Sequence, residues 1–359
     1  MMIDGNWAVL LTCFLLVLYI AQGGVVLSSI IHLSHMAGAR WRADITPYAH
    51  QTVHLYPLAF ILLIILLVAQ EYTFPYYRDT TIHLNAWHNY PFLMIRELVL
   101  FVLVAATHYG FVRASKQHEK HNTEQTRNRL TWYATAVPFL YFVYGTVIAW
   151  DFSMTLTPGW HSPMHAPYFF ISNFHMFLGF FVVIAYLPRF RKGGQTGISE
   201  QSFNYLAQMM LGLTLLWTYT FYAQFLTIWY GNLPHETGRL YAMMFQDGDI
   251  RRGGSALAPL FWWFVVLKSF LPFVLLIFAI VRHTPFLTAL VGLIIFLGTF
   301  LEQFTWIAGA YSDWQPLLGS LFDIAVVITV SLLAYLLMRA GFAGKAGPVS
   351  WLSRQRERK

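Results

Sequence analysis

The stretch WAVLLTCFLLVLYIAQGGVVLSSII, residues 7–31, decides the class of fold. It contains no charged residue, and about 20 predominantly apolar residues are enough for a helix to cross a bilayer. It is too long for the apolar core of a signal peptide. Asp4 precedes it where a basic start would be expected, and no small-residue cleavage site follows. The stretch therefore predicts a permanent transmembrane helix.

The composition extends this interpretation to the whole chain. Of 359 residues, 57% are hydrophobic and only 11% are charged, whereas a soluble chain has about 25% charged residues. These values exclude a disordered chain, a nucleic-acid-binding domain and an ordinary two-domain soluble enzyme. Aromatic residues make up 18%, which is typical of chains that cross many membrane–water interfaces. We predict an all-α, polytopic integral membrane helical bundle.

Nine segments are long and apolar enough to span the membrane, and we expect them to form a single transmembrane domain over residues 1–339. A basic tail follows at 340–359. The longest loops between segments are too small to fold alone, so any large extramembrane catalytic domain must belong to another chain. The predicted spans are 7–31, 50–70, 91–112, 131–150, 166–187, 205–230, 257–281, 285–307 and 316–338.

The 23 lysines and arginines predict the orientation of these nine spans. Seventeen fall in the loops after odd-numbered spans and in the C-terminal tail, and four fall on the opposite side. Positively charged loops are typically cytoplasmic. The N-terminus is therefore expected outside and the C-terminus in the cytoplasm. The remaining two, Arg96 and Lys268, lie inside predicted helices.

Ionisable residues inside the membrane are candidates for function, because burying them is costly. Most of those found here belong to the outer half of the predicted bundle, and two histidines mark an inner, histidine-rich entrance. Each of them also has a structural alternative, such as an interhelical salt bridge or a solvated helix end. The candidates for a proton path or a quinone site are Asp151, His175, Arg96, Glu97, Lys268, Glu302, Asp323, His32 and His54.

Arg96 and Glu97 are adjacent, so they point about 100° apart on a helix and cannot simply pair with each other. Each needs a partner on another helix. Asp323 or Glu302 is the partner expected for Arg96 in a purely structural salt bridge. Glu302 lies close enough to the predicted interface that solvation is its alternative.

The cysteine and histidine content argues against a redox cofactor in this chain. Cys13 is the only cysteine, which excludes intrachain disulfides and cysteine-ligated iron–sulfur or zinc sites. A haem would need a pair of histidines at matched depth on facing helices, and only His175 is predicted near the middle of the membrane. We expect no bound haem, cluster or metal. Quinol is a possible substrate, with aromatic residues around Asp151 and His175 as its apolar slot.

Four stretches resemble the NrfD-like, or polysulphide-reductase-type, family of membrane subunits. The similarity covers nearly the whole chain in order, and is greatest to the ActF-type subunit of alternative complex III. The stretches are GGVVLSSIIHLSHMAGARW (23–41), LNAWHNYPFLMIRELVLF (84–101), IAWDFSMTLTPGWHSPMHAPYFF (148–170) and LLWTYTFYAQFLTIWYGNLPHET (215–237).

The resemblance implies two four-helix bundles with flanking helices and no bound redox group, in a bacterial inner membrane. It implies partners: a sister membrane subunit, an iron–sulfur and molybdopterin-type extramembrane subunit, and multihaem cytochromes. The family's aspartate falls on Asp151 and its intramembrane arginine on Arg96. Relatives have ten helices where we count nine, and often histidine at Lys268. His161 and His165 are additional histidines here.

Three functions remain open from the sequence. The chain is a cofactor-free subunit of a quinol-oxidising respiratory complex that contributes a proton path or a quinone pocket, or it is purely an anchor of that complex. The third is a secondary transporter with Lys268 and Asp323 as its site, although the inverted repeats and matched broken helices typical of transporters are not found in the sequence.

Overall fold

The computed structural model describes residues 4–34, 39–78, 86–187, 198–245, 254–311, 317 and 319–343. Those residues form helices and the turns between them, without a strand. The α-helices are α1 (Asp4–Leu33), α2 (Ala39–Ala49), α3 (Tyr56–Val68), α4 (Gln70–Thr73), α5 (Tyr90–His121), α6 (Glu124–Ala149), α7 (His165–Tyr186), α8 (Glu200–Gly231), α9 (Pro234–Met244), α10 (Gly254–Val265), α11 (Leu271–Ile277), α12 (Ala279–His283), α13 (Pro285–Ala308) and α14 (Leu321–Ala343). The short 3₁₀-helices are η1 (His50–Leu55), η2 (Pro75–Tyr77) and η3 (Ala86–His88), and the π-helical turns are η4 (Trp150–Met154) and η7 (Val266–Phe270).

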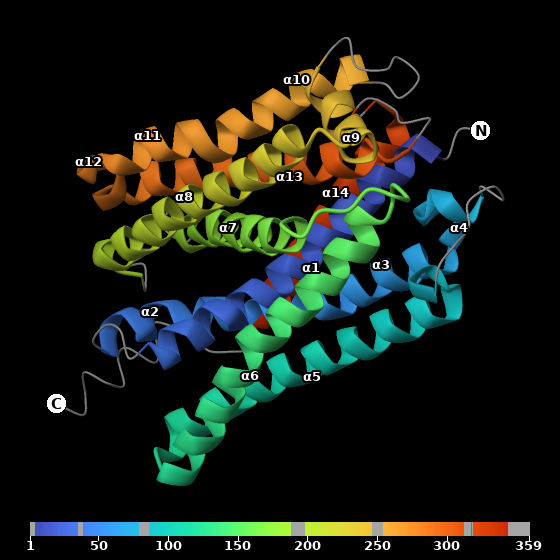
Figure 1. Ribbon diagram of the computed structural model, residues 1–359. Helices are drawn as coiled ribbons and strands as arrows, with labels where there is room; N and C mark the ends of the chain where they lie inside the picture. Colours follow the sequence, from blue (N-terminus) through green and yellow to red (C-terminus); the bar gives the residue numbers. More distant parts are fainter. Residues whose placement is uncertain are drawn as a thin grey trace.

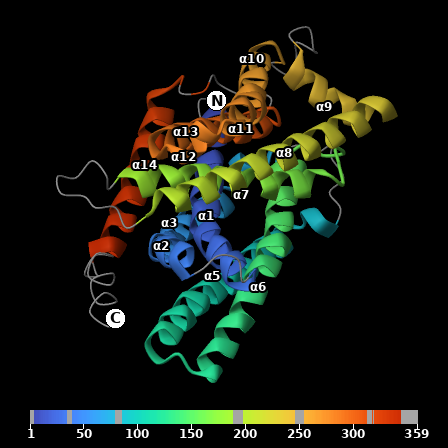
Figure 2. The same ribbon diagram turned by 90° about the vertical axis from the view of Figure 1, so that its left-hand side faces the viewer.

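Eight helical segments within the described residues are long and apolar enough to cross a membrane. The protein is therefore an all-α, multi-pass membrane protein. The ninth predicted span, 205–230, lies in the continuous helix α8, which is not among the eight. Figures 1 and 2 show α1 and α14 beginning at the same end of the bundle, as an odd number of crossings requires. The count of crossings and the orientation stay predictions.

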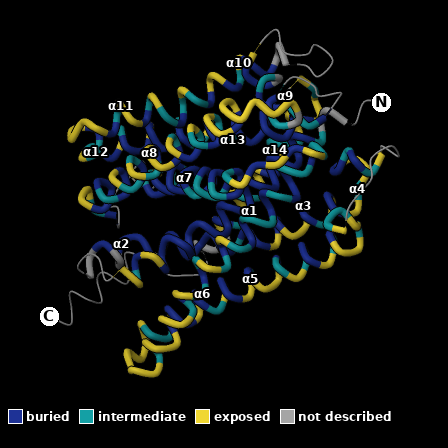
Figure 3. Tube along the Cα trace, in the orientation of Figure 1, coloured by how far each residue is buried: buried dark blue, intermediate teal, exposed yellow. Residues whose placement is uncertain are grey.

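Helix α1 is the centre of the fold. It contacts η1 and α3, α6, α7, α13 and α14, and the most apolar part of its membrane-spanning segment is entirely buried (Figure 3). One group of helices around it comprises η1–α3, α5 and α6, and the other comprises α7, α8, α10–α12 and α13. Figure 1 shows the second group above α1 and the first below it. α14 lies against α1 and η1.

Helices also occupy segments that were expected to be loops. α5 continues to His121 and α6 begins at Glu124, so residues 113–130 form a helical hairpin that projects from the bundle (Figure 1). Asn122 ends α5 in the left-handed conformation, and Thr123 caps α6, which satisfies the exposed backbone groups at the turn. Prediction from apolar runs ended the first of these helices too early and began the second too late. Lysine, arginine and glutamine also favour helix, although they interrupt an apolar run.

Two glycines bring α7 and α13 into direct backbone contact. A Cβ atom built on Gly179 would lie 2.5 Å from the carbonyl oxygen of Gly292, and one on Gly292 would lie 2.5 Å from that of Gly179. Small residues at such crossings let membrane helices approach closely. This crossing holds α7 and α13 together along the length that also carries the buried polar groups described below.

Gly292→Ala should therefore destabilise the protein by about 1–3 kcal/mol, the usual cost of overpacking a tight interface. The added Cβ would also clash with a methyl carbon of Val182. The change is measured as a lower melting temperature of the purified protein in detergent. Gly212→Ala is the matched control, because a Cβ on that exposed helical glycine meets nothing within 4 Å. Equal melting temperatures for the two variants would contradict the close crossing.

Candidate functional site

The first buried ion pair joins α5 to the π-helical turn η4. Arg96 Nη2 donates to Asp151 Oδ1 at 2.6 Å, and Arg96 Nε donates to Asp151 Oδ2 at 2.8 Å. The aspartate is fully buried and the arginine nearly so. The structure therefore contradicts the expected pairing of Arg96 with Asp323 or Glu302. The sequence could not distinguish three acids at similar depth on different helices.

Trp87, from η3, completes this pair on both sides. Its carbonyl oxygen accepts a hydrogen bond from Arg96 Nη1 at 2.7 Å, and its indole N–H donates to Asp151 Oδ1 at 2.8 Å. The guanidinium also lies 4.0 Å from the centre of the Trp87 ring. A buried charge pair is stable only when its remaining hydrogen-bonding groups also find partners. Here the carbonyl oxygen of Trp87 is a partner for the arginine, and its indole N–H is a partner for the aspartate.

Glu97 is a fully buried carboxyl group beside this pair. Asp151 and Tyr144 lie close enough to interact with it, although neither oxygen of Glu97 makes a hydrogen bond of standard geometry with any residue that the structure describes. The guanidinium of Arg96 is occupied by Asp151 and Trp87. Unlike Asp151, Glu97 makes no ion pair with a cation in the described part of the chain, so it is a buried acid beside the pair and not a member of it.

The second buried ion pair lies in the other group of helices. Lys268 Nζ donates to Glu302 Oε2 at 2.8 Å, and both side chains are fully buried. Ser172 Oγ donates to the same oxygen at 2.6 Å, and Trp217 Nε1 donates to Glu302 Oε1 at 2.9 Å. The alternative of a solvated Glu302 is therefore wrong. The sequence left solvation open because a position along a helix does not reveal which face is buried.

Both ion pairs use a charged residue on a π-helical turn. Asp151 lies in η4 and Lys268 lies in η7. Such turns add a residue within a helix and often occur at functional sites. Pro272, the second residue after η7, lacks the backbone N–H that a regular helix would use. The wide turn shifts the direction of the side chains that follow and places each charged group between helices.

His175 lies near the second pair. Its Nε2 forms a hydrogen bond with Thr214 Oγ1 at 3.2 Å, and the ring is close enough to Lys268 for their charges to interact. The side chain is fully buried, and among the described residues its Nδ1 has no hydrogen-bond partner. A neutral imidazole in this position can accept a proton at one nitrogen while the other stays bonded.

Buried polar groups extend between the two ion pairs. His165 Nε2 forms a hydrogen bond with Ser153 Oγ at 2.9 Å, two residues beyond Asp151. The His165 ring packs against Tyr168, whose hydroxyl interacts with Glu302. Serine, histidine and tyrosine can each donate and accept a hydrogen bond. Buried polar side chains therefore lie between the two ion pairs, joined by one hydrogen bond, one ring contact and one electrostatic interaction.

Arg239, on α9, closes this region from the end of the bundle. Its Nη2 donates to the carbonyl oxygens of Trp306 at 2.7 Å and Ser153 at 3.1 Å, and its Nη1 donates to that of Met154 at 3.2 Å. Burial lowers the pKa of the guanidinium to about 9, so it remains charged at neutral pH. In the sequence, Arg239 was one of the four basic residues counted in loops on the side opposite the basic loops, and no other role was predicted for it.

Arg239→Lys should cost about 1–3 kcal/mol for each carbonyl oxygen left without a donor, because an ammonium group cannot reproduce the planar fork of donors. The melting temperature of the purified protein is the measurement. Arg127→Lys is the control, since Arg127 is exposed near the tip of the α5–α6 hairpin. An unchanged melting temperature for Arg239→Lys would contradict this role.

The remaining predicted residues do not join the two ion pairs. Asp323 is buried in the first turn of α14, where its backbone N–H donates to Ser320 Oγ; no hydrogen bond or ion pair in the described part of the chain links it to either pair. His32, at the end of α1, forms a hydrogen bond with Thr131. His54 lines a separate cavity beside α5. The nine candidates therefore divide among distinct places in the fold.

The sequence interpretation missed the neutral partners of the charges. Trp87, Ser172, Tyr168 and Trp217 complete the two ion pairs or lie against them, yet each belongs to a common residue type in this chain. The only sequence signal was proximity to a charged position, as for Trp87 in the LNAWHNYPFLMIRELVLF stretch. Among the described residues, no group of three histidine, cysteine, aspartate or glutamate side chains could hold a metal ion.

Comparison with known proteins assigns no family to the chain. No family model matches it, and no curated protein sequence matches it significantly.

Proposed function

We propose that this chain is a cofactor-free integral membrane subunit of a quinol-oxidising electron-transfer complex and that it provides a proton route. The observation that carries the proposal is the buried polar region that runs from Glu97 and Asp151, through His165 and Tyr168, to Glu302 and Lys268. Oxidation of a quinol releases two protons with two electrons, and buried acids and imidazoles are the groups that transfer such protons.

The residues of this chain also indicate which subunits would carry the electrons. A chain with a single cysteine offers no thiolate set for an iron–sulfur cluster. The electrons therefore pass to partner subunits, for which the family resemblance suggests an iron–sulfur and molybdopterin-type subunit, multihaem cytochromes and a sister membrane subunit. Quinol binds in this chain or in that neighbour. The bacterial inner membrane and the cytoplasmic C-terminus belong to the same proposal.

The second candidate, an anchor subunit of the same complex, is favoured by one observation. All three nitrogens of Arg96 and both carboxylate oxygens of Asp151 take part in hydrogen bonds, two of them with Trp87, as expected of a structural bridge. Glu97 distinguishes the proton-route function from the anchor function. The Arg96–Asp151 salt bridge alone would serve an anchor, and it does not require a second buried acid that lacks a cation of its own.

Purification of the chain from its native membrane in mild detergent tests the proposal. Mass spectrometry of the purified material should identify multihaem and iron–sulfur polypeptides, and the assembly should oxidise a quinol. Isolation of the chain as a stable single protein, with no such partners, would contradict both the proton-route and the anchor functions. Solute uptake by vesicles that contain this chain alone would instead favour a transporter.

A further inference from the structure

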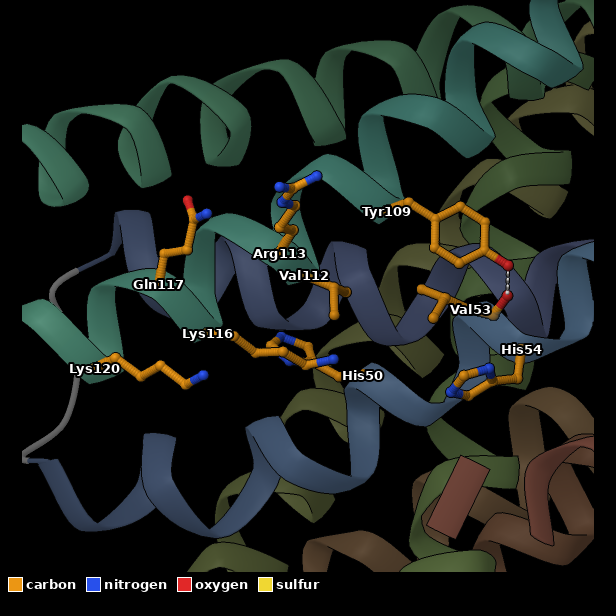
Figure 4. Close-up of a pocket in the computed structure, with 9 residues that line it drawn as sticks. All are labelled: His50, Val53, His54, Tyr109, Val112, Arg113, Lys116, Gln117 and Lys120. Carbon is orange, nitrogen blue, oxygen red and sulfur yellow. Dashed lines mark hydrogen bonds between the residues drawn. The ribbon is translucent and has the colours of Figure 1, made fainter. Parts of the chain in front are cut away.

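A cavity of about 460 Å³ lies beside the C-terminal part of α5, several helical turns away from Arg96. One wall is the last part of α5 and the other is η1 (Figure 4). Its volume falls in the range of pockets that hold small molecules, about 300–1,000 Å³. No residue of the proposed proton route lines this cavity. Of the nine candidates selected from the sequence, His54 is the one that does.

The cavity is strongly basic. Arg113, Lys116 and Lys120 line it from positions three and four residues apart on α5, so they follow one face of the helix. His50 and His54 line the opposite wall, and no acidic residue is among the lining residues. In Figure 4, the ammonium groups of Lys116 and Lys120 point toward the α2–η1 side, whereas the guanidinium of Arg113 points away from it.

The cavity also has apolar lining residues, and exposed apolar residues lie further along the same helices. Val53, Val112 and the ring of Tyr109 line it, and the Tyr109 hydroxyl is already bonded to the carbonyl oxygen of Val53. Further along α5, Val102 and Leu103 are exposed, as are several large apolar residues of α3. A bound molecule would therefore place a negative group among the lysines and an apolar chain along the helices.

We propose that this cavity binds the phosphate-bearing headgroup of an anionic phospholipid. Lys116 and Lys120 hold the phosphate, with His50 on the opposite wall, and the acyl chains lie along the apolar surfaces of α3 and α5. Basic pockets between membrane helices are suited to this class of ligand, because each cation near the headgroup adds to an attraction that operates within a few ångströms of the membrane surface. The charged end of α5 also belongs to the side predicted to be cytoplasmic.

The test uses the protein purified with any native partners, delipidated, and titrated with defined lipids. Phosphatidylglycerol or cardiolipin should raise its melting temperature and remain bound in native mass spectrometry, whereas zwitterionic phosphatidylcholine should do neither. The variant Lys116→Gln/Lys120→Gln should retain the anionic lipid roughly 30-fold less, from about 1 kcal/mol for each lysine removed. Arg127→Gln is the matched control: it removes a cation from the same hairpin, outside the cavity.

Several outcomes would overturn the proposal. They are equal stabilisation by phosphatidylcholine, full retention of anionic lipid by the double variant, and an equal loss in Arg127→Gln. Inorganic phosphate that stabilises as well as the lipid would identify a soluble phosphate ligand instead. If the double variant does not fold, lipid retention by the unmodified protein is measured at rising salt, where it should fall. Retention that does not depend on salt would contradict a site built on lysines.

Discussion

Replacing Lys268 by methionine should destabilise the protein by about 3–5 kcal/mol, the usual cost of removing one partner of a buried ion pair. Glu302 would keep its hydrogen bonds from Ser172 and Trp217 but would lose the cation 2.8 Å away that balances its charge. Both side chains are fully buried, so water cannot replace that cation without opening the helices. The melting temperature in detergent is the measurement.

The double variant Lys268→Met/Glu302→Gln should recover most of this loss. A glutamine at 302 retains an oxygen for the Trp217 indole and no longer carries a charge. Replacing both partners of a buried pair by neutral groups is often close to neutral in stability. If the two single changes are instead additive in the double variant, the pair is not coupled, and the geometry of this second site is wrong.

Glu97→Gln should reduce quinol oxidation by the intact complex about 100-fold or more, the lower range of what a positioned acid or base contributes. The change keeps the shape of the side chain but removes the proton that it exchanges. Its stability should change little, because Glu97 has no dedicated cation to leave behind. Steady-state quinol oxidation and proton release on each side of proteoliposomes are the measurements, with the melting temperature recorded for the same sample.

Glu71→Gln is the control for this change, since Glu71 is exposed in the short helix α4. It should leave quinol oxidation unchanged. Normal turnover and proton yield in Glu97→Gln would favour the anchor function over the proton route. A large loss of stability in that variant would show that Glu97 is instead part of a structural network with Asp151 and Tyr144.

The sequence predicted the helices better than their ends. The long apolar runs lie in α1, α5, α6, α7, α13 and α14, because an apolar segment must satisfy its backbone hydrogen bonds internally to cross a membrane. The ends were missed where the chain leaves the predicted membrane. The α5–α6 hairpin and the helix α9 are held by capping residues and tertiary contacts, for which hydropathy carries no signal.

The sequence predicted which charged residues belong to the candidate site, but it did not predict which of them pair with each other. Arg96, Glu97, Asp151, Lys268 and Glu302 were all selected because charges are rare inside a membrane. Their pairing depends on which helix faces touch. That in turn depends on features such as the Gly179–Gly292 contact, which no spacing in the sequence reveals.

By itself, the sequence determined that this chain is a helical membrane protein, and which charged groups lie inside it. Both follow from the free energy of transferring apolar and charged side chains between water and lipid, which depends mainly on composition along the chain. Only the tertiary structure decided that Arg96 pairs with Asp151 and Lys268 with Glu302, that Glu97 has no cation of its own, and that three basic residues of α5 line a cavity. The physical reason is that hydrogen bonds and ion pairs act over a few ångströms between helices that are distant in sequence.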